Sequence, residues 1–495
     1  MAFVTGGKHF GQYTFEHWFD DEYKNDSFMD SGHRMKVVLK NFHIIDEDTD
    51  ITGSLVIENG IISEVLGGHA PSHIYGAAMV IDGAGLSPSD KLPVLMPAFV
   101  DLHAHFRESG LYEKGASLSL EAPFSLEAPF TSELIDSACL SAAAGGFGTV
   151  VCMANTKPPT DTIKKAAAVK SRSDALGLID LYPVLSLTKN MEGAELSEIT
   201  GISAGGIFPL MLSEDGKDPA DEELFLNAMK EAARIGIPVS CHCDFGGDES
   251  SAVSRVIELG KKAGCHIHIA HVSKKESVEI IRQAKASEMA VSKTGETGGF
   301  ILTCEAMPHN LCLTEEDAEK LGRLTYGRVN PPLRSEEDRQ ALVKALADGT
   351  IDAIATDHAP HTEADKEAGA PGFSGLETAF SAVYTEFVHR EFICDDIYPA
   401  AMDLKKLSSL MSAAPARLLG LGEGSFAGKT FKRRGHKRGR LLPGYQADIV
   451  IADTEIPWTV DPAAFKSRGK NSAFTGRQLF GKILMTLHSG RVVFG

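Results

Sequence analysis

The chain lacks the features of several classes of protein. No apolar run reaches the roughly 18 residues of a membrane span, and the first residues lack the basic-then-apolar order of a signal peptide. The eight cysteines form no CxxC pair, which argues against a disulfide framework and favours a reducing compartment. Basic residues are the minority, with 49 against 67 acidic residues and a formal net charge of -18. We therefore expect a cytoplasmic protein that binds neither nucleic acid nor membrane.

The chain contains enough apolar material for a large core. Of its 495 residues, 43% are hydrophobic, an amount that fits one large domain and a smaller one. Short apolar segments separated by turn residues at 35–92 and at 438–495 predict a small β-sandwich domain that both chain ends build together. Residues 1–34 are polar, acidic and without a clear period, so we interpret them as an N-terminal extension, with Met35 as a second candidate start.

The central segment, 93–437, alternates apolar runs of strand length with amphipathic stretches of helix length. The apolar runs are Ala98–His103, Thr149–Met153, Leu181–Leu185, Ile207–Leu212, Pro238–His242, His266–His271, Phe300–Cys304 and Ile351–Asp357. Strands separated by helices in this way are typical of a (β/α)8 barrel, and an open doubly wound sheet is the alternative. We therefore predict an α/β fold in which a metal-dependent barrel carries the function.

Histidine and aspartate residues stand at the ends of these runs. His103 ends the first run and His105 follows two residues later. Because side chains alternate along a strand, both imidazoles lie on one face. The carboxyl ends of all barrel strands converge on one site. Four imidazoles and two carboxylates in that position fit two zinc ions bridged by one carboxylate, and manganese or cobalt suits the same ligands. The predicted ligands are His103, His105, Asp215, His242, His271 and Asp357.

Some polar residues near these ligands are assigned to different roles. His266 and His268 lie on the opposite strand face from the ligand in the same run, so we interpret them as packing residues or as supports of a ligand. Lys217 lies two residues after Asp215, and a carboxylated lysine is an alternative bridge between two metals; we prefer Asp215. The basic run at 432–440 is interpreted as a solvated linker, because the chain as a whole is acidic.

Several segments resemble one known family. They are DLHAHFRE at 101–108, GGFGTVVCMANTKP at 145–158, SEDG at 213–216, AHVSKKES at 270–277, GRVNPPLRS at 327–335, ATDHAPHT at 355–362, GLETAF at 375–380 and GKNSAFTG at 469–476. With these segments the chain, from about Met35 to Gly495, is similar to the bacterial single-domain dihydroorotases of the amidohydrolase superfamily.

The resemblance implies a cyclic amidohydrolase with two Zn²⁺ ions per subunit. Such an enzyme interconverts L-dihydroorotate and N-carbamoyl-L-aspartate in de novo pyrimidine (UMP) biosynthesis, with Asp357 as the general base and then the general acid. Arg107 would offer the substrate carboxylate a bidentate, charge-assisted partner, and hydantoinases and allantoinases usually lack this arginine. By the same resemblance, the other substrate-binding residues are Asn155, Asn330, His361 and Gly372.

Three features depart from the family pattern. The family usually has Pro where this chain has Ala154, and a second histidine where it has Asn310. A tandem SLEAPF hexad at 119–130 enlarges the loop after the first strand. Because such loops shape substrate access, we expect rate and specificity to be affected more than the fold. Without the resemblance, Asn155 would be interpreted as a turn residue before Lys157-Pro158-Pro159, and Asn330 as a residue that Pro331 biases to extended backbone.

Two other functions are open from the sequence. A hydantoinase or allantoinase would share the metal ligands, and Arg107 and Asn155 are the residues that discriminate against it. A catalytically silent relative that acts as a structural partner of aspartate transcarbamoylase would have lost metal ligands, and none is missing here. The expected assembly is a homodimer, the commonest symmetric form of such enzymes, with a small molecule as substrate.

Overall fold

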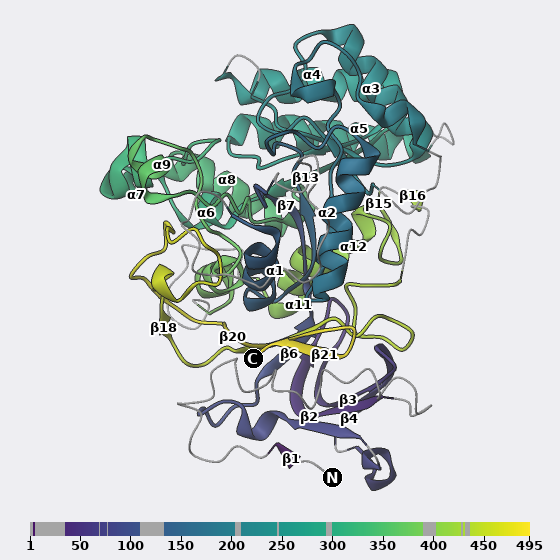
Figure 1. Cartoon of the computed structure of the whole chain (residues 1–495), viewed down its shortest axis with the longest axis vertical. Coiled ribbons are helices and arrows are strands. Elements are labelled where there is room, and N and C mark those ends of the chain that lie inside the picture. The colour runs from purple at the N-terminus through teal and green to yellow at the C-terminus, as the bar shows by residue number, and fades with distance from the viewer. Residues whose placement is uncertain are drawn as a thin grey trace, which may run out of the picture.

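A computed structural model of the chain describes residues 3–4, 35–68, 70–76, 78–108, 133–202, 209–244, 247–293, 299–389, 402–426, 429–430 and 436–495. Most of the extension predicted at 1–34 and both SLEAPF hexads lie outside these residues. The described residues form a β-rich region and a larger region in which strands alternate with helices (Figure 1).

The β-rich region contains strands from both ends of the chain, as the sequence predicts. Within the described residues they form one hydrogen-bonded sheet of nine strands, in which Val94 of β6 faces Ala452 of β17. Asn59 and Gly60 connect β3 to β4 with positive φ angles of 53° and 78°, which a tight hairpin turn requires. The strands are β1 Phe3–Val4, β2 Lys36–Ile45, β3 Asp50–Glu58, β4 Ile61–Gly67, β5 Met79–Asp82, β6 Val94–Pro97, β17 Ile449–Asp453, β20 Lys482–His488 and β21 Arg491–Phe494.

The larger region is a closed barrel of parallel strands. Its strands are β7 Phe99–Ala104, β8 Phe147–Cys152, β9 Asp180–Pro183, β10 Leu212–Ser213, β11 Val239–Cys241, β12 His266–Ile269, β13 Ile301–Ala306 and β14 Ala353–Ile354. β7 to β9 pair in parallel with one another, and so do β10 to β14. Parallel bridges between Leu185 and Leu212 and between Ala104 and His358 join the two groups at both edges. The predicted barrel is therefore confirmed, and the open sheet is excluded because a closed barrel has no free edge.

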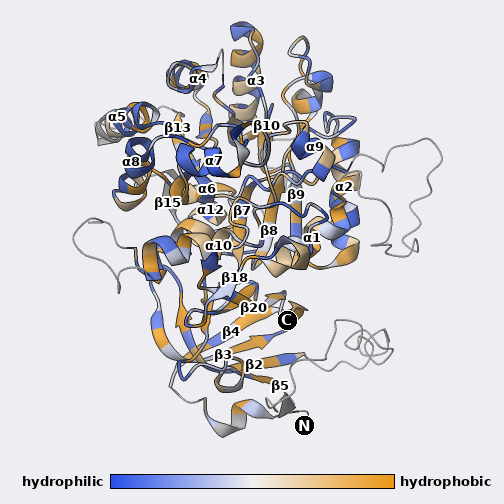
Figure 2. Cartoon of the chain, turned by 90° about the vertical axis from the view of Figure 1, so that its left-hand side faces the viewer, coloured by the Kyte–Doolittle hydropathy of each residue, from blue (hydrophilic) through white to orange (hydrophobic). Residues whose placement is uncertain are grey.

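Helices cover the outside of the barrel (Figure 1). Two of the longer ones begin with a capping side chain: Thr162 accepts a hydrogen bond from the backbone N–H of Lys165, and Asp221 from that of Leu224. In Figure 2 these helices carry both hydrophilic and hydrophobic residues, as expected for helices with one face on a core. The helices are α1 Ile135–Ala144, α2 Ile163–Leu176, α3 Glu222–Ile235, α4 Glu249–Ala263, α5 Lys275–Lys293, α6 Pro308–Cys312, α7 Glu315–Leu321, α8 Glu336–Ala347, α9 Glu363–Glu367, α10 Ala379–Val383, α11 Leu404–Ser408 and α12 Ala414–Leu418.

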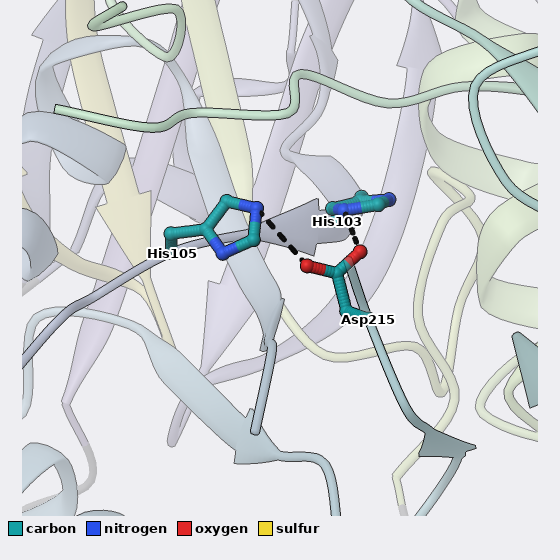
Figure 3. Close-up of side chains that lie close together, drawn as sticks. All are labelled: His103, His105 and Asp215. Atoms are coloured by element: carbon teal, nitrogen blue, oxygen red, sulfur yellow. Dashed lines mark ion pairs between the residues drawn. The ribbon is translucent and has the colours of Figure 1, made fainter. Parts of the chain in front are cut away.

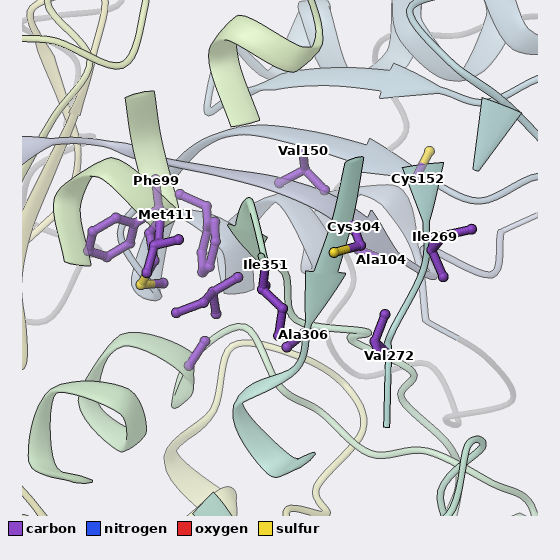
Figure 4. Packing of buried hydrophobic residues seen from close by; sticks show 14 of the residues in the cluster. Phe99, Ala104, Val150, Cys152, Ile269, Val272, Cys304, Ala306, Ile351 and Met411 are labelled. Atoms are coloured by element: carbon purple, nitrogen blue, oxygen red, sulfur yellow. The ribbon is translucent and has the colours of Figure 1, made fainter. Parts of the chain in front are cut away.

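The apolar core continues from the barrel into the β-rich region. Phe99 at the start of β7 is fully buried and packs among other apolar side chains of the barrel (Figure 4). Its ring centroid lies 5.5 Å from that of Phe147 and 5.0 Å from that of Phe380. The same cluster includes Val450 and Ala452 of β17, so the sheet packs directly on the barrel. This continuous burial holds the two regions together. Within the described part of the chain, no helix combines the length and apolar character needed to cross a membrane.

Candidate active site

The six predicted ligands stand where barrel strands end. His103 lies in β7 and His105 directly after it, while His242 follows β11 immediately. The other three lie two or three residues beyond β10, β12 and β14. His271 and Asp357 have positive φ angles of 32° and 47°, strained conformations that turn the chain out of its strand direction. All six side chains are buried, none with more than 9% of its surface exposed.

The carboxylate of Asp215 is the centre of the group. Its Oδ1 lies 3.2 Å from His103 Nε2, and its Oδ2 lies 3.7 Å from His105 Nε2 (Figure 3). On its other side, Oδ1 lies 3.5 Å from His242 Nδ1, which in turn is 2.8 Å from His271 Nε2. Asp215 therefore belongs to two sets of three ligand atoms, one with His103 and His105 and one with the other two histidines.

These donor atoms fit two cations that share one carboxylate. His103 Nε2 is buried and has no hydrogen-bond partner among the described residues. His242 Nδ1 and His271 Nε2 point toward one another, as the nitrogen lone pairs of two imidazoles do around a metal ion. The side chain of Lys217 is exposed, whereas Asp215 is buried among the histidines. The geometry supports Asp215 as the bridging ligand, which stays our proposal.

The remaining predicted ligand, Asp357, joins this group through His105. Its Oδ1 lies 3.0 Å from His105 Nε2 and 3.8 Å from His103 Nε2. Burial alone would raise the pKa of this carboxyl group, but the contact with His105 and the charges of the neighbouring imidazoles hold the pKa below its usual range. Asp357 is therefore a carboxylate at neutral pH, in the state that can accept a proton.

Burial and neighbouring charge also set the state of the histidines. Burial lowers the pKa of His271 to about 3, and the charges of His242 and His103 act in the same direction. His271 is thus neutral, the form in which an imidazole binds a metal. The pKa of Asp215 lies well below its usual value, because the imidazoles of His105 and His103 outweigh the opposing effect of burial.

One supporting residue, Glu305, was missed by the sequence analysis. It lies within β13, where its Oε1 accepts a hydrogen bond from His103 Nδ1 at 2.9 Å and its Oε2 lies 3.0 Å from His268 Nε2. The ring of His268 reaches Thr303 Oγ1 at 2.9 Å on its other side. By fixing the proton on His103 Nδ1, Glu305 directs Nε2 of that ring toward the site. The signal in the sequence was a carboxylate inside an otherwise apolar run.

We expect a Glu305→Leu variant to bind zinc about 10 to 100 times more weakly, since such carboxylates orient the ligand histidine. A Glu305→Gln variant should lose less, because its side-chain oxygen can still accept from His103 Nδ1. Competition with a chromogenic chelator measures both. The matched control is Glu133→Gln, another buried carboxyl group, which bonds Ser137 and Ser467 away from the ligands. Equal zinc affinity in Glu305→Leu and the parent protein would contradict this role.

Three predicted substrate-binding residues lie together beside the ligands. Arg107 Nη2 is 3.5 Å from His361 Nε2, and Arg107 Nε is buried without a hydrogen-bond partner among the described residues. Gly372 has a φ of 109°, and a Cβ added there would lie 2.5 Å from Ala359 Cβ, so only glycine fits. A buried guanidinium with an unused N–H group is suited to an anionic group of a ligand.

The two predicted asparagines contact the ligands themselves. Asn155 accepts a hydrogen bond from His105 Nδ1 at 2.9 Å and donates one to Asp215 Oδ2 at 2.7 Å. Asn330 Nδ2 lies 3.0 Å from His242 Nε2 and lines a cavity of about 220 Å³ beside that ring. The structure thus places both at the site, while their contact with substrate stays a proposal.

Comparisons with known proteins agree with this site. The model of the amidohydrolase family matches residues 94–493. A dihydroorotase of Clostridium botulinum (strain Eklund 17B / Type B) is 32% identical over 468 residues, which cover 93% of this chain and 100% of the relative. A dihydroorotase of Caldanaerobacter subterraneus subsp. tengcongensis is 34% identical over 475 residues, which cover 88% of this chain and 96% of the relative.

Solved structures share the fold. An L-hydantoinase (dihydropyrimidinase) from Arthrobacter aurescens matches with a TM-score of 0.70 at 24% identity, over 92% of this chain and 95% of that one. A dihydropyrimidinase from Brevibacillus agri NCHU1002 matches with a TM-score of 0.69 at 18% identity, over the same shares. The chain therefore belongs to the amidohydrolase family. Within it, the chain belongs with the bacterial dihydroorotases and is a hydrolase of cyclic amides.

Proposed function

We propose that this enzyme is a zinc-dependent dihydroorotase of the cytoplasm, which interconverts L-dihydroorotate and N-carbamoyl-L-aspartate in pyrimidine synthesis. The observation that carries the proposal is Arg107, whose buried Nε has no partner among the described residues and whose Nη2 lies 3.5 Å from Nε2 of His361, another predicted substrate-binding residue. Dihydroorotate differs from an uncharged hydantoin by a free carboxylate, which a guanidinium binds with two parallel hydrogen bonds. The cytoplasmic location is supported by the free thiol state of every cysteine the structure describes.

Two bound zinc ions would lower the pKa of a water molecule to near neutrality and polarise the ring carbonyl group. His103, His105, Asp215, His242 and His271 would hold them, together with Asp357. The cavity beside His242, lined by Asn330, leaves room for a ligand next to these residues.

The residues of the chain then bind the substrate and move one proton. Arg107 and Asn155 hold the carboxylate of dihydroorotate, Asn330 contacts its ring, and His361 and the backbone at Gly372 add further contacts. Asp357 accepts the proton of the attacking water as the new bond to the carbonyl carbon forms. It then gives this proton to the ring nitrogen as the C–N bond breaks, which leaves a ureido group and a carboxyl group, and the remaining proton of the carboxyl group passes to solvent to give the carboxylate. The reverse sequence closes the ring.

The proposal is tested by the rate of L-dihydroorotate ring opening, with hydantoin and allantoin measured under the same conditions. We expect dihydroorotate to be the preferred substrate, and we expect removal of zinc by a chelator to abolish turnover and its return to restore it. Preference for an uncharged ring would replace the proposal by a hydantoinase or allantoinase activity. Zinc-loaded protein without any turnover would favour the silent partner of aspartate transcarbamoylase, although all six ligand residues are present and buried.

The assembly is a separate prediction. We expect a homodimer, because two-fold symmetric dimers are the commonest assemblies of soluble enzymes. We also propose an association with aspartate transcarbamoylase. Light scattering of the protein alone and after mixing with that enzyme measures both.

A further inference from the structure

The loop that follows β14 closes on itself around one lysine. At its two ends, His358 forms a bridge with Phe373, and the N–H of Ala359 donates to the carbonyl oxygen of Phe373 at 2.9 Å. The loop carries two predicted substrate-binding residues, His361 and Gly372, and its middle forms α9. Lys366, in this helix, is fully buried.

The ammonium group of Lys366 is satisfied by backbone carbonyl groups. Its Nζ donates to the carbonyl oxygens of Ala370 and Gly372, each at 2.8 Å, and to that of Arg328 at 3.2 Å. An ammonium group has three protons, so these bonds use all of them. Burial of a charge costs free energy unless such dipoles surround it. Each of the three carbonyl groups must therefore keep its position to offset the cost of burying this ammonium group.

These carbonyl groups belong to two separate segments of the candidate site. Ala370 and Gly372 form the end of the loop, where His361 Nε2 also donates to the carbonyl oxygen of Pro371 at 2.8 Å. Arg328 precedes Asn330 by two residues, and its carbonyl oxygen also accepts the N–H of Gly372 at 2.9 Å. Lys366 therefore joins the segment that presents Asn330 to the segment that presents His361 and Gly372.

We propose that Lys366 is a positioning residue for substrate binding, which sets the distance between the Asn330 segment and the His361–Gly372 loop through its three carbonyl contacts. The inference rests on the proposed function for its substrate. Lys366 does not touch the metal ligands in this arrangement, so its removal acts on binding of the ring rather than on the chemical step.

The first test is a Lys366→Met variant of the zinc-loaded full chain. Methionine keeps much of the volume but donates no hydrogen bond. We expect KM for L-dihydroorotate to rise by about tenfold or more, while kcat stays within about threefold of the parent value and the amount of bound zinc is unchanged. This is the pattern of a variant that loses binding energy common to the ground state and the transition state. The matched control is Lys285→Met, which removes a partly buried lysine that donates to the Thr350 carbonyl group and to Asp352. An unchanged KM, or a fall in kcat alone, would overturn the proposal.

A second measurement is independent of the reaction. The N–H of Gly372 should exchange with deuterium about tenfold faster in Lys366→Met than in the parent protein, with no change in Lys285→Met, because its bond to Arg328 is no longer held in place. Unchanged exchange would overturn the positioning role. If the parent protein fails to open dihydroorotate, the proposed function falls, and the exchange result still decides the role of Lys366.

The pH dependence of the parent enzyme provides a test that needs no variant. Burial lowers the pKa of Lys366 to about 8, and the charge of Arg328 acts in the same direction. The other charged or titratable groups around it are Tyr326, His361, Glu363, Asp365 and Glu367. Because the ammonium form makes the three bonds, KM should rise as the pH passes above about 8. A KM that stays constant from pH ~7 to ~9.5 would contradict the proposal.

Discussion

An Asp357→Asn protein is expected to bind zinc and yet to lose about 100-fold to 10,000-fold in kcat, the usual contribution of a positioned general base and acid. Asparagine has the size of aspartate and keeps an oxygen for His105 Nε2, which is 3.0 Å from the present carboxylate. It cannot accept the proton of the attacking water. The rate of dihydroorotate ring opening, measured together with the zinc content, separates loss of proton transfer from loss of metal.

The control for this variant is Glu377→Gln. Burial raises the pKa of Glu377 to about 7, so its neutral form already exists near neutral pH, and an amide should be tolerated. Its carboxyl group bonds the backbone N–H groups of Lys466 and Ser467, away from the metal ligands. Full turnover by an Asp357→Asn protein with normal zinc content would refute the assignment of Asp357.

The second large effect is expected at Arg107. An Arg107→Leu variant should lose about 100-fold to 10,000-fold in kcat/KM for L-dihydroorotate, because two charge-assisted hydrogen bonds contribute about 1.5 to 3 kcal/mol each. The same variant should change turnover of an uncharged hydantoin by less than about tenfold, since that ring has no carboxylate to lose. The measurement is the ratio of the two kcat/KM values in parent and variant.

Arg107→Lys is the matched variant, because it keeps the charge but removes the fork that binds both carboxylate oxygens. Its kcat/KM for dihydroorotate should lie between those of the parent and Arg107→Leu. If Arg107→Leu damages both substrates equally, Arg107 supports the site in general, and the argument for dihydroorotate over a hydantoin disappears.

The barrel and the grouping of the proposed ligands were predictable from local patterns. Five of the eight apolar runs end in or near a histidine or aspartate, and because all parallel strands end on one face, the convergence of His103, Asp215 and His271 follows from topology. The lengths of the strands were less predictable. Leu212–Ser213 and Ala353–Ile354 are much shorter than the apolar runs Ile207–Leu212 and Ile351–Asp357, because apolar character records burial and not strand pairing.

Residues that act through distant partners could not be found in this way. Glu305 meets His103 across 202 positions of sequence, and no local pattern indicates that contact. Lys366 lies in the polar segment Glu363–Glu367, which is typical of an exposed helix. Its burial arises only when the loop closes and Arg328 approaches from another part of the chain. Both are long-range tertiary effects, which override local propensity.

The pairing of β6 with β17 has a consequence for synthesis on the ribosome. β6 leads directly into β7, the strand that carries His103, yet its antiparallel partner Ile449–Asp453 is translated only after the whole barrel. Until then β6 presents unpaired backbone groups on that side, which can pair with another nascent chain. Completion of the sheet is therefore a late step, and this side of β6 is covered only after the barrel has been translated.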